Sequence, residues 1–216
     1  GTATAGNAWD AYSAAISLAK AAPGLEEQVR PSARKKLDSA RRAMLLSDHS
    51  EILTQLHKGA HCREVREPID WARGFDGGIL SLLDWRGLSN LLVTQALAQI
   101  EHGDPVAAVD TLLDGAQLGR DFMHSHLMIN EMIGGSFLGI STFWAVGRND
   151  LLVRLSREAL DRFARGLAIL DEHLQKVGPS LQGEAVLFAR TAQVHPELFK
   201  GMLSSGSWRH GFSSRL

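Results

Sequence analysis

The chain has 216 residues, of which 44% are hydrophobic and 22% are charged, values that are ordinary for a single globular domain with a substantial core. Its 23 Lys and Arg nearly balance its 24 Asp and Glu, so no strong field attracts nucleic acid or an anionic membrane. Cys62 is the sole cysteine, which excludes an intrachain disulfide and a multi-cysteine zinc site.

The N-terminal part of the chain predicts helices and no strands. Asn7 is expected to cap the first helix, which ends at Pro23-Gly24. Three helices are expected here, over residues 8–21, 33–46 and 51–59. No run of residues alternates in the way that a half-buried strand requires. Residues 60–77 contain Pro68 and several glycines and predict a long connection.

The middle of the chain predicts an antiparallel helical hairpin. A long helix over 79–102 ends at His102-Gly103, and a second helix over 105–123 follows at once. Asp104 is in the N-cap position and Pro105 is in the first helical position, where a missing N–H and a fixed φ cost nothing. So short a break between two amphipathic helices requires them to fold back on each other.

Three more helices are expected over residues 125–147, 155–177 and 180–192. The first is apolar and long enough to span a bilayer, but Asn130 and Glu131 lie inside it, so we expect a buried helix and no transmembrane span. Residues 195–216 are rich in Gly and Ser and predict a partly docked tail. The sequence therefore predicts one all-α domain over residues 1–194, built from irregular antiparallel hairpins.

Four segments carry a resemblance to a known group of proteins: "NAWDAYSAAISLA", "HCREVREPIDWARGFDGGILSLLDWRGLSNLL", "ALAQIEHGDPVAAVDTLLDGAQLGRDF" and "LQGEAVLF". The chain is similar to the tetratricopeptide-like, all-helical proteins of planctomycetes and myxobacteria, over most of residues 7–188. The resemblance implies an irregular tetratricopeptide-like bundle or short superhelix, a bacterial source and an exported location. It brings no catalytic residues, and no clean repeat of about 34 residues runs through the chain.

The start of the sequence bears on location. Gly1 is followed by small residues, a composition typical of the region just past a removed leader, and we expect an exported protein. A periplasmic or lipid-anchored protein would fit this start, and a cytoplasmic fragment would look the same.

The segment "LHKGAHC" is the candidate metal site. His57 and His61 are four residues apart, so a helix places both imidazoles on one face, beside Cys62. The HExxH pattern of metalloproteases requires glutamate after the first histidine, where this chain has Lys58. A polar helix end with a buried cysteine is the expectation, with His57, His61 and Cys62 as the candidate ligands of the alternative.

The segment "FMHSHLMINEMIGGSFLG", residues 122–139, carries two histidines and a glutamate. A helix turns neighbours two residues apart by about 200°, so His124 and His126 diverge and hold no common metal. Glu131 is the residue that needs an explanation, because a carboxylate in an apolar helix requires a partner. We expect that partner to mark a site if one exists.

The glycines of the same segment invite a hydrolase interpretation. "GGSFLG" resembles a nucleophile elbow, but that motif needs glycine at position 138, where this chain has leucine, and no strand precedes it. Gly134, Gly135 and Gly139 are better explained as a face that packs closely against another helix.

The sequence favours a non-enzymatic scaffold or protein-interaction module that binds a protein or peptide partner, without a cofactor. Trp71 and Trp85 are the expected anchors, and Arg73 lies in the same charged connection as Trp71. Two alternatives stay open. One is a metal-binding protein or hydrolase-type enzyme that uses His57, His61 and Cys62 or a buried Glu131. The other is a carrier of a small apolar ligand, with a cavity lined by Phe137, Phe143 and Trp144.

Overall fold

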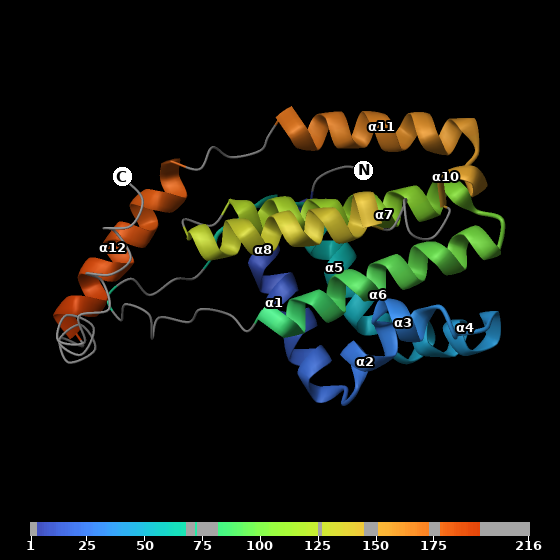
Figure 1. Ribbon diagram of the computed structural model, residues 1–216, viewed down its shortest axis with the longest axis horizontal. Coiled ribbons are helices and arrows are strands. Elements are labelled where there is room, and N and C mark those ends of the chain that lie inside the picture. Colours follow the sequence, from blue (N-terminus) through green and yellow to red (C-terminus); the bar gives the residue numbers. More distant parts are fainter. Residues whose placement is uncertain are drawn as a thin grey trace, which may run out of the picture.

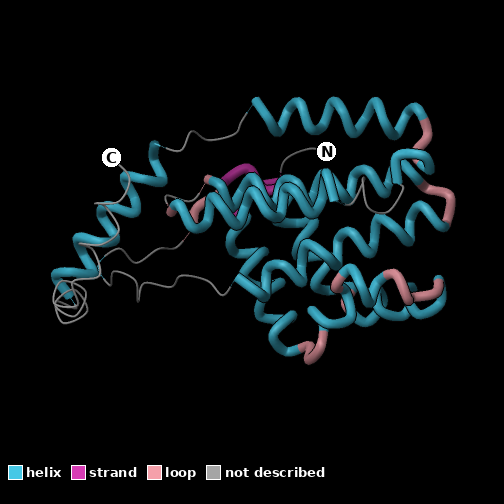
Figure 2. Tube along the Cα trace, viewed as in Figure 1, coloured by secondary structure: helices cyan, strands magenta, loops and turns pink. Residues whose placement is uncertain are grey.

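The computed structural model describes residues 4–67, 72, 82–124, 127–144, 151–172 and 178–194 of the chain. Within these ranges the protein is almost entirely helical, as Figure 1 and Figure 2 show, and the predicted all-α class is confirmed. Three long helices, α6, α7 and α8, form the centre, and the shorter N-terminal helices pack below and behind them in Figure 1.

The N-terminal helices are α1 (Ala8–Ala21), α2 (Leu25–Val29), α3 (Pro31–Arg34), α4 (Ser39–Asp48) and α5 (Ser50–Ala60). Asn7 caps α1 as predicted, since its side chain accepts a hydrogen bond from the N–H of Trp9. The expected single helix over 33–46 is wrong. Asp38 is extended and its Oδ1 accepts from the N–H of Arg41 at 2.8 Å, so it starts a new helix.

A short parallel pair of strands joins the two ends of this N-terminal unit. β1 (Thr4–Asn7) pairs with β2 (Cys62–Glu64), contrary to the expectation of no strands and of an irregular connection from residue 60. Asn7 reinforces the pairing, because its amide donates to the carbonyl of Arg66 at 2.9 Å and its Oδ1 accepts from the N–H of Arg66 at 2.8 Å. The start of the chain is thereby tied to the end of α5.

The predicted antiparallel hairpin is present. It consists of α6 (Leu82–Glu101) and α7 (Pro105–Met123), which pack along each other. Gly103 has a φ of 82°, a left-handed conformation that favours glycine. Asp104 caps α7, since its Oδ1 accepts from the N–H of Ala107 at 2.9 Å, and Pro105 takes the first helical position.

The next helix, α8 (Met128–Gly139), packs tightly against α7 and continues as a π-helical turn, η2 (Ile140–Trp144). The close approach requires glycine at two points. A Cβ on Gly119 would lie 2.6 Å from the backbone N of Leu138, and one on Gly134 would lie 2.8 Å from that of Met123. In contrast, Gly135 has open space around it, as has Gly139, so only Gly134 of the three predicted contact glycines serves this face.

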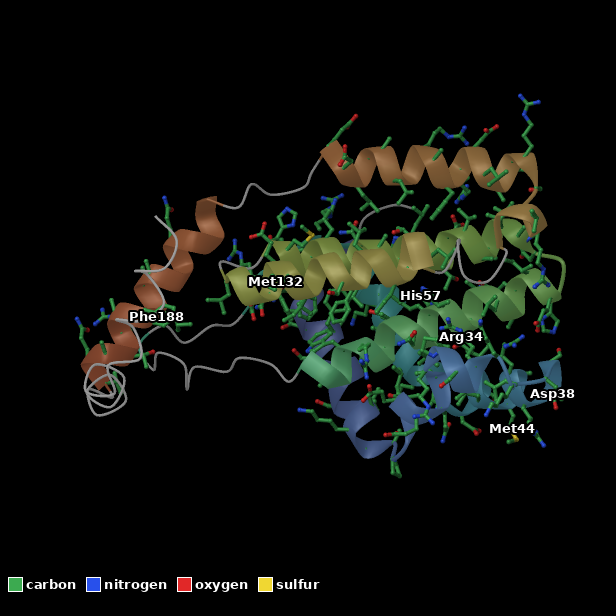
Figure 3. All side chains as sticks on the ribbon, in the orientation of Figure 1. Arg34, Asp38, Met44, His57, Met132 and Phe188 are labelled. Carbon is green, nitrogen blue, oxygen red and sulfur yellow. The ribbon has the colours of Figure 1, made fainter. Side chains whose placement is uncertain are left out.

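The C-terminal helices are α10 (Leu151–Arg154), α11 (Arg157–Glu172) and α12 (Gly178–Val194). Helix α11 lies on α7 and runs in the same direction, while α12 lies apart at the left of Figure 1 and packs on α8. Two exposed apolar residues that Figure 3 labels, Met132 and Phe188, are on α8 and α12. Within the described ranges, no helix is long and apolar enough to cross a membrane.

The core is centred on a cluster of aromatic rings from α1, α6 and α7. Trp85 is 1% exposed, and its ring packs edge-to-face on Trp9 at 5.6 Å and on Phe122 at 4.3 Å. Tyr12 completes the cluster, 6.2 Å from Trp85. Trp85 is therefore a core residue, and its predicted role as an anchor for a partner is wrong because no part of the ring is free to make contact.

Two arginines are buried against α6. Arg34 donates to Oδ1 of Asn90 at 3.2 Å, and burial, followed by the nearby charge of Arg42, lowers its pKa to about 10. Arg42 forms an ion pair with Glu101 and donates to the carbonyl of Leu37 at 3.0 Å. Only 6% of Arg42 is exposed, so Glu101 supplies the counter-charge that a buried guanidinium needs.

Candidate functional site

The most polar cluster in the described part of the chain forms where α5, α6 and α7 meet. His57 lies in the last turns of α5, at the centre of Figure 3, and both of its ring nitrogens are engaged. Nδ1 lies 2.6 Å from Oδ2 of Asp114 on α7, and Nε2 lies 2.9 Å from Oε1 of Gln95 on α6. One imidazole thus connects three helices.

The same carboxylate also reaches the second predicted histidine. His61 is the residue that follows α5, and its Nε2 lies 3.4 Å from Oδ1 of Asp114. The i, i+4 spacing therefore places both imidazoles on one side of the helix end, as predicted, and Asp114 lies between them. Its side chain is only 13% exposed, so the carboxylate is directed inward to the two rings.

Asp114 also determines the protonation of His57. Burial lowers the pKa of His57, but the hydrogen bond to Asp114 and the negative charge of that carboxylate, together with the hydrogen bond to Gln95, outweigh burial and raise the pKa above its usual 6.5. Both ring nitrogens lie at hydrogen-bond distance from side-chain oxygens, an arrangement in which the protonated ring donates to both. The ring is held in place, and each of its nitrogens already has a partner.

Cys62, the third candidate ligand, forms a hydrogen bond with the end of α5. Its Sγ donates to the carbonyl of Lys58 at 3.3 Å from the first position of β2, and the side chain is half-buried. In the described ranges, no group of three or more His, Cys, Asp or Glu side chains is spaced to hold a metal ion. Metal binding by His57, His61 and Cys62 stays a prediction.

A cleft of about 490 Å³ opens beside this cluster, between the end of α5, α7 and α11. We call it the α5–α7–α11 cleft; it is lined by His61, Asp110, Leu113, Asp114, Arg162, Arg165, Gly166 and Ile169. Arg162 donates to both carboxylate oxygens of Asp110, from Nε to Oδ1 and from Nη2 to Oδ2, the latter at 2.9 Å. Arg165 forms no ion pair within the described ranges, and Ile169 is 58% exposed.

A second polar group lies deeper, on the core side of α7. The hydroxyl of Tyr12 donates to Oδ2 of Asp121 at 2.7 Å, and the amide of Gln117 donates to Oδ1 at 2.6 Å. Asp121 is 1% exposed, and burial raises its pKa from 3.8 to about 6 against these hydrogen bonds. Burial, then the charge of Asp121, raises the pKa of Tyr12 well above 10. The group is closed to solvent and serves the fold.

The carboxylate that the sequence singled out is half-buried. Oε2 of Glu131 is covered and has no hydrogen-bond partner among the described residues, so the expected partner is not found there. Its neighbour Asn130 instead donates to both oxygens of Glu67, at 2.9 and 3.0 Å. Trp71 and Arg73 lie outside the described residues.

The cavity expected for a small apolar ligand also differs from the structure. Phe137 is 2% exposed and packs edge-to-face on Phe122 at 5.3 Å, so it fills the core. The side chains of Phe143 and Trp144 lie outside the described part. A groove does exist on this side of the molecule, but it is lined by Leu138 and Thr142 from α8 and η2.

Four residues of the site were missed from the sequence: Gln95, Asp114, Arg162 and Arg165. Each is an ordinary polar residue on a helix, and only the packing of α6, α7 and α11 brings it to the histidines or to the cleft. One signal was readable. Asp110 and Asp114 are four residues apart on a helix whose other face is apolar, which places both carboxylates together.

The tetratricopeptide-like resemblance stays a prediction. No protein-family model matches this chain, and neither a curated protein nor a solved structure shows significant similarity to it.

Proposed function

We propose that this protein is a non-enzymatic helical module that binds a segment of a partner protein in the α5–α7–α11 cleft. The observation that carries the proposal is the make-up of the cleft. Two apolar side chains, Leu113 and Ile169, line the cleft together with charged and polar ones, among them Arg165 and His61. An apolar centre with a polar rim is the usual composition of a protein-binding surface.

The charges of the cleft favour a particular kind of segment. Asp110 is neutralised by Arg162, and Asp114 is shared between His57 and His61. Arg165 is left as a cation that forms no ion pair in the described ranges. A partner that places an apolar side chain on Ile169 and a carboxylate on Arg165 would complement this surface.

The state of the polar side chains favours binding over catalysis. A general base or nucleophile must present a free atom to a substrate. Both nitrogens of His57 are occupied, and the thiol of Cys62 is bonded to a backbone carbonyl. His61 is the accessible imidazole of the cluster, with a side chain 44% exposed, and no serine, threonine or cysteine lines the cleft beside it.

Peptide selection tests this proposal. A displayed library of random peptides would be selected on the protein, and enriched peptides would be measured by fluorescence anisotropy. We expect peptides that combine acidic and apolar residues, with affinity reduced at least about tenfold by Ile169→Glu, because a carboxylate then faces the apolar side chain of the peptide. Arg165→Glu should act in the same direction on the acidic residue.

Val153→Glu is the matched control, because Val153 is 84% exposed on α10 and does not line the cleft. That variant should bind the peptides like the wild type. Enriched peptides that bind Ile169→Glu unchanged, or a selection that enriches none, would contradict the proposal. Stoichiometric metal in the purified protein, lost in the His57→Ala, His61→Ala double variant, would instead favour the metal-binding alternative.

A further inference from the structure

A second hollow lies toward the C-terminal ends of α7 and α11 and has a different chemistry from the α5–α7–α11 cleft. It has a volume of about 400 Å³, within the range of small-molecule sites. It is lined by Arg120, Leu138, Thr142, Leu167, Ala168, Leu170 and Asp171. We call it the Arg120 groove. The two hollows share no lining residue.

Arg120 is the one basic side chain among the described residues that line the groove, and no carboxylate lies at hydrogen-bond distance from it there. The side chain is 19% exposed, and Nε is covered without a hydrogen-bond partner among the described residues. Its nearest carboxylate is Asp121, at 3.5 Å from Nη2, which is longer than a hydrogen bond. Asp121 already accepts hydrogen bonds from Tyr12 and Gln117 at shorter distances, so Arg120 is not the main partner of its carboxylate.

A guanidinium in this position needs a planar anion. It offers five N–H donors in a fixed fork, which matches the two oxygens of a carboxylate. Asp171 also lines the groove, but it is an exposed residue and forms no ion pair with Arg120 in the described part of the chain. Among the described residues, Arg120 therefore has no carboxylate at hydrogen-bond distance, and a ligand carboxylate in the groove would supply one.

The remaining walls are suited to an alkyl chain. Leu138, Leu167 and Leu170 contribute apolar surface, and Ala168 leaves the groove open at an exposed position. One wall is the junction of α8 with the π-helical turn η2, between Leu138 and Thr142. Such π-helical turns occur frequently at functional sites, because they displace side chains from the regular helical path.

We propose that the Arg120 groove binds an alkyl carboxylate, with the carboxylate on Arg120 and the chain along the leucines. The described residues that line the groove and the cleft are different, so either proposal can fail without the other. A carboxylate is favoured over a phosphate ester because the described residues of the groove include a single cation, and its apolar walls leave little polar contact for a dianion.

Calorimetric titration with decanoate below its micelle concentration tests the site, with decan-1-ol as the neutral analogue. We expect decanoate to bind about tenfold or more tightly than decan-1-ol, the size of one charge-assisted hydrogen bond. Arg120→Met removes the charged guanidinium, keeps an unbranched flexible side chain, and should abolish this preference, leaving the two ligands with similar affinity. Circular dichroism would establish that the variant is folded.

Ala168→Trp provides a second variant that does not touch Arg120. A large side chain at this exposed position should fill the groove and weaken decanoate binding at least about tenfold. Arg165→Met, in the other cleft, is the matched control and should leave binding unchanged. The proposal is overturned if decanoate does not bind, if decan-1-ol binds as tightly, or if Arg165→Met rather than Ala168→Trp removes binding. Tighter binding of decyl phosphate would overturn the choice of carboxylate.

Discussion

Two adjacent glycines of α8 should respond in opposite directions to the same substitution. Gly134 faces α7, and a Cβ there would lie 2.6 Å from Cγ and 2.8 Å from the backbone N of Met123, as well as against the carbonyl of Gly119. Carbon atoms make favourable contact at about 3.5 Å. Because two of the three neighbours are backbone atoms, and the Gly119 carbonyl is the closest of them, the helices must separate by roughly 1 Å.

The net cost of Gly134→Ala can be bounded. Overpacking of this kind costs about 1–3 kcal/mol, and more where backbone has to move. Alanine recovers about 1 kcal/mol of helix propensity, so we expect a net loss of about 2 kcal/mol in the free energy of unfolding. Gly135→Ala is the matched control. Its Cβ would meet nothing within 4 Å, so the propensity gain of roughly 0.5–1 kcal/mol should appear alone.

Urea denaturation followed by circular dichroism measures both variants against the wild type. The midpoint should fall for Gly134→Ala and rise for Gly135→Ala, with little change in the slope. If the two variants shift in the same direction, the close crossing of α7 and α8 is not where the structure places it. Gly119→Ala should also lower the free energy of unfolding, because its Cβ meets the backbone of the same crossing. The loss in the double variant should be smaller than the sum of the two single losses, because one separation of α7 and α8 makes room for both methyl groups.

Three further predictions concern charged groups. Burial raises the pKa of Asp121 from 3.8 to about 6, so between these pH values the folded protein binds a proton that the unfolded chain has lost, and stability falls as pH rises. The free energy of unfolding of Asp121→Asn, relative to that of the wild type, should therefore grow by up to about 3 kcal/mol from pH 4 to pH 7. A difference that stays constant with pH would refute the assignment. The raised pKa of His57 contributes stability that is present below pH 6.5 and is lost as pH rises through the pKa of the folded state. Asp114→Asn should lower the pKa of His57 in an NMR titration of the imidazole. An unchanged pKa would show that Asp114 is not the main partner of His57. Glu101→Gln leaves Arg42 buried without a counter-charge and should cost about 2 kcal/mol in thermal or urea unfolding, whereas Arg42→Met in the same background should recover part of the loss.

Local signals in the sequence predicted the helix starts well. Asn7 and the Asp104-Pro105 pair act within one turn of their own helix, so no tertiary information is needed to recognise them. The break at Asp38 was missed because apolar residues continue at helical spacing across it. The strands at Cys62–Glu64 and its partner were also missed, since they are too short to alternate and exist only because the chain ends of one unit meet.

The candidate site, too, could be predicted from the sequence only where the signal lies within one helix. The shared face of His57 and His61 follows from their spacing along one helix. Their common partner, Asp114, lies 57 residues from His57, and no pattern in the sequence connects the two. Trp85 was misjudged because a large aromatic residue is typical both of a core and of a binding surface, and only its burial decides between them.

The position of α11 has a consequence for both hollows. This helix packs chiefly on α7, and it forms one wall of the α5–α7–α11 cleft and one wall of the Arg120 groove. A helix held chiefly through one partner is a natural unit of local unfolding, and its release would dismantle both walls in one step. A molecule that holds α11 in place from one hollow therefore favours binding in the other, and this coupling free energy is the same in both directions.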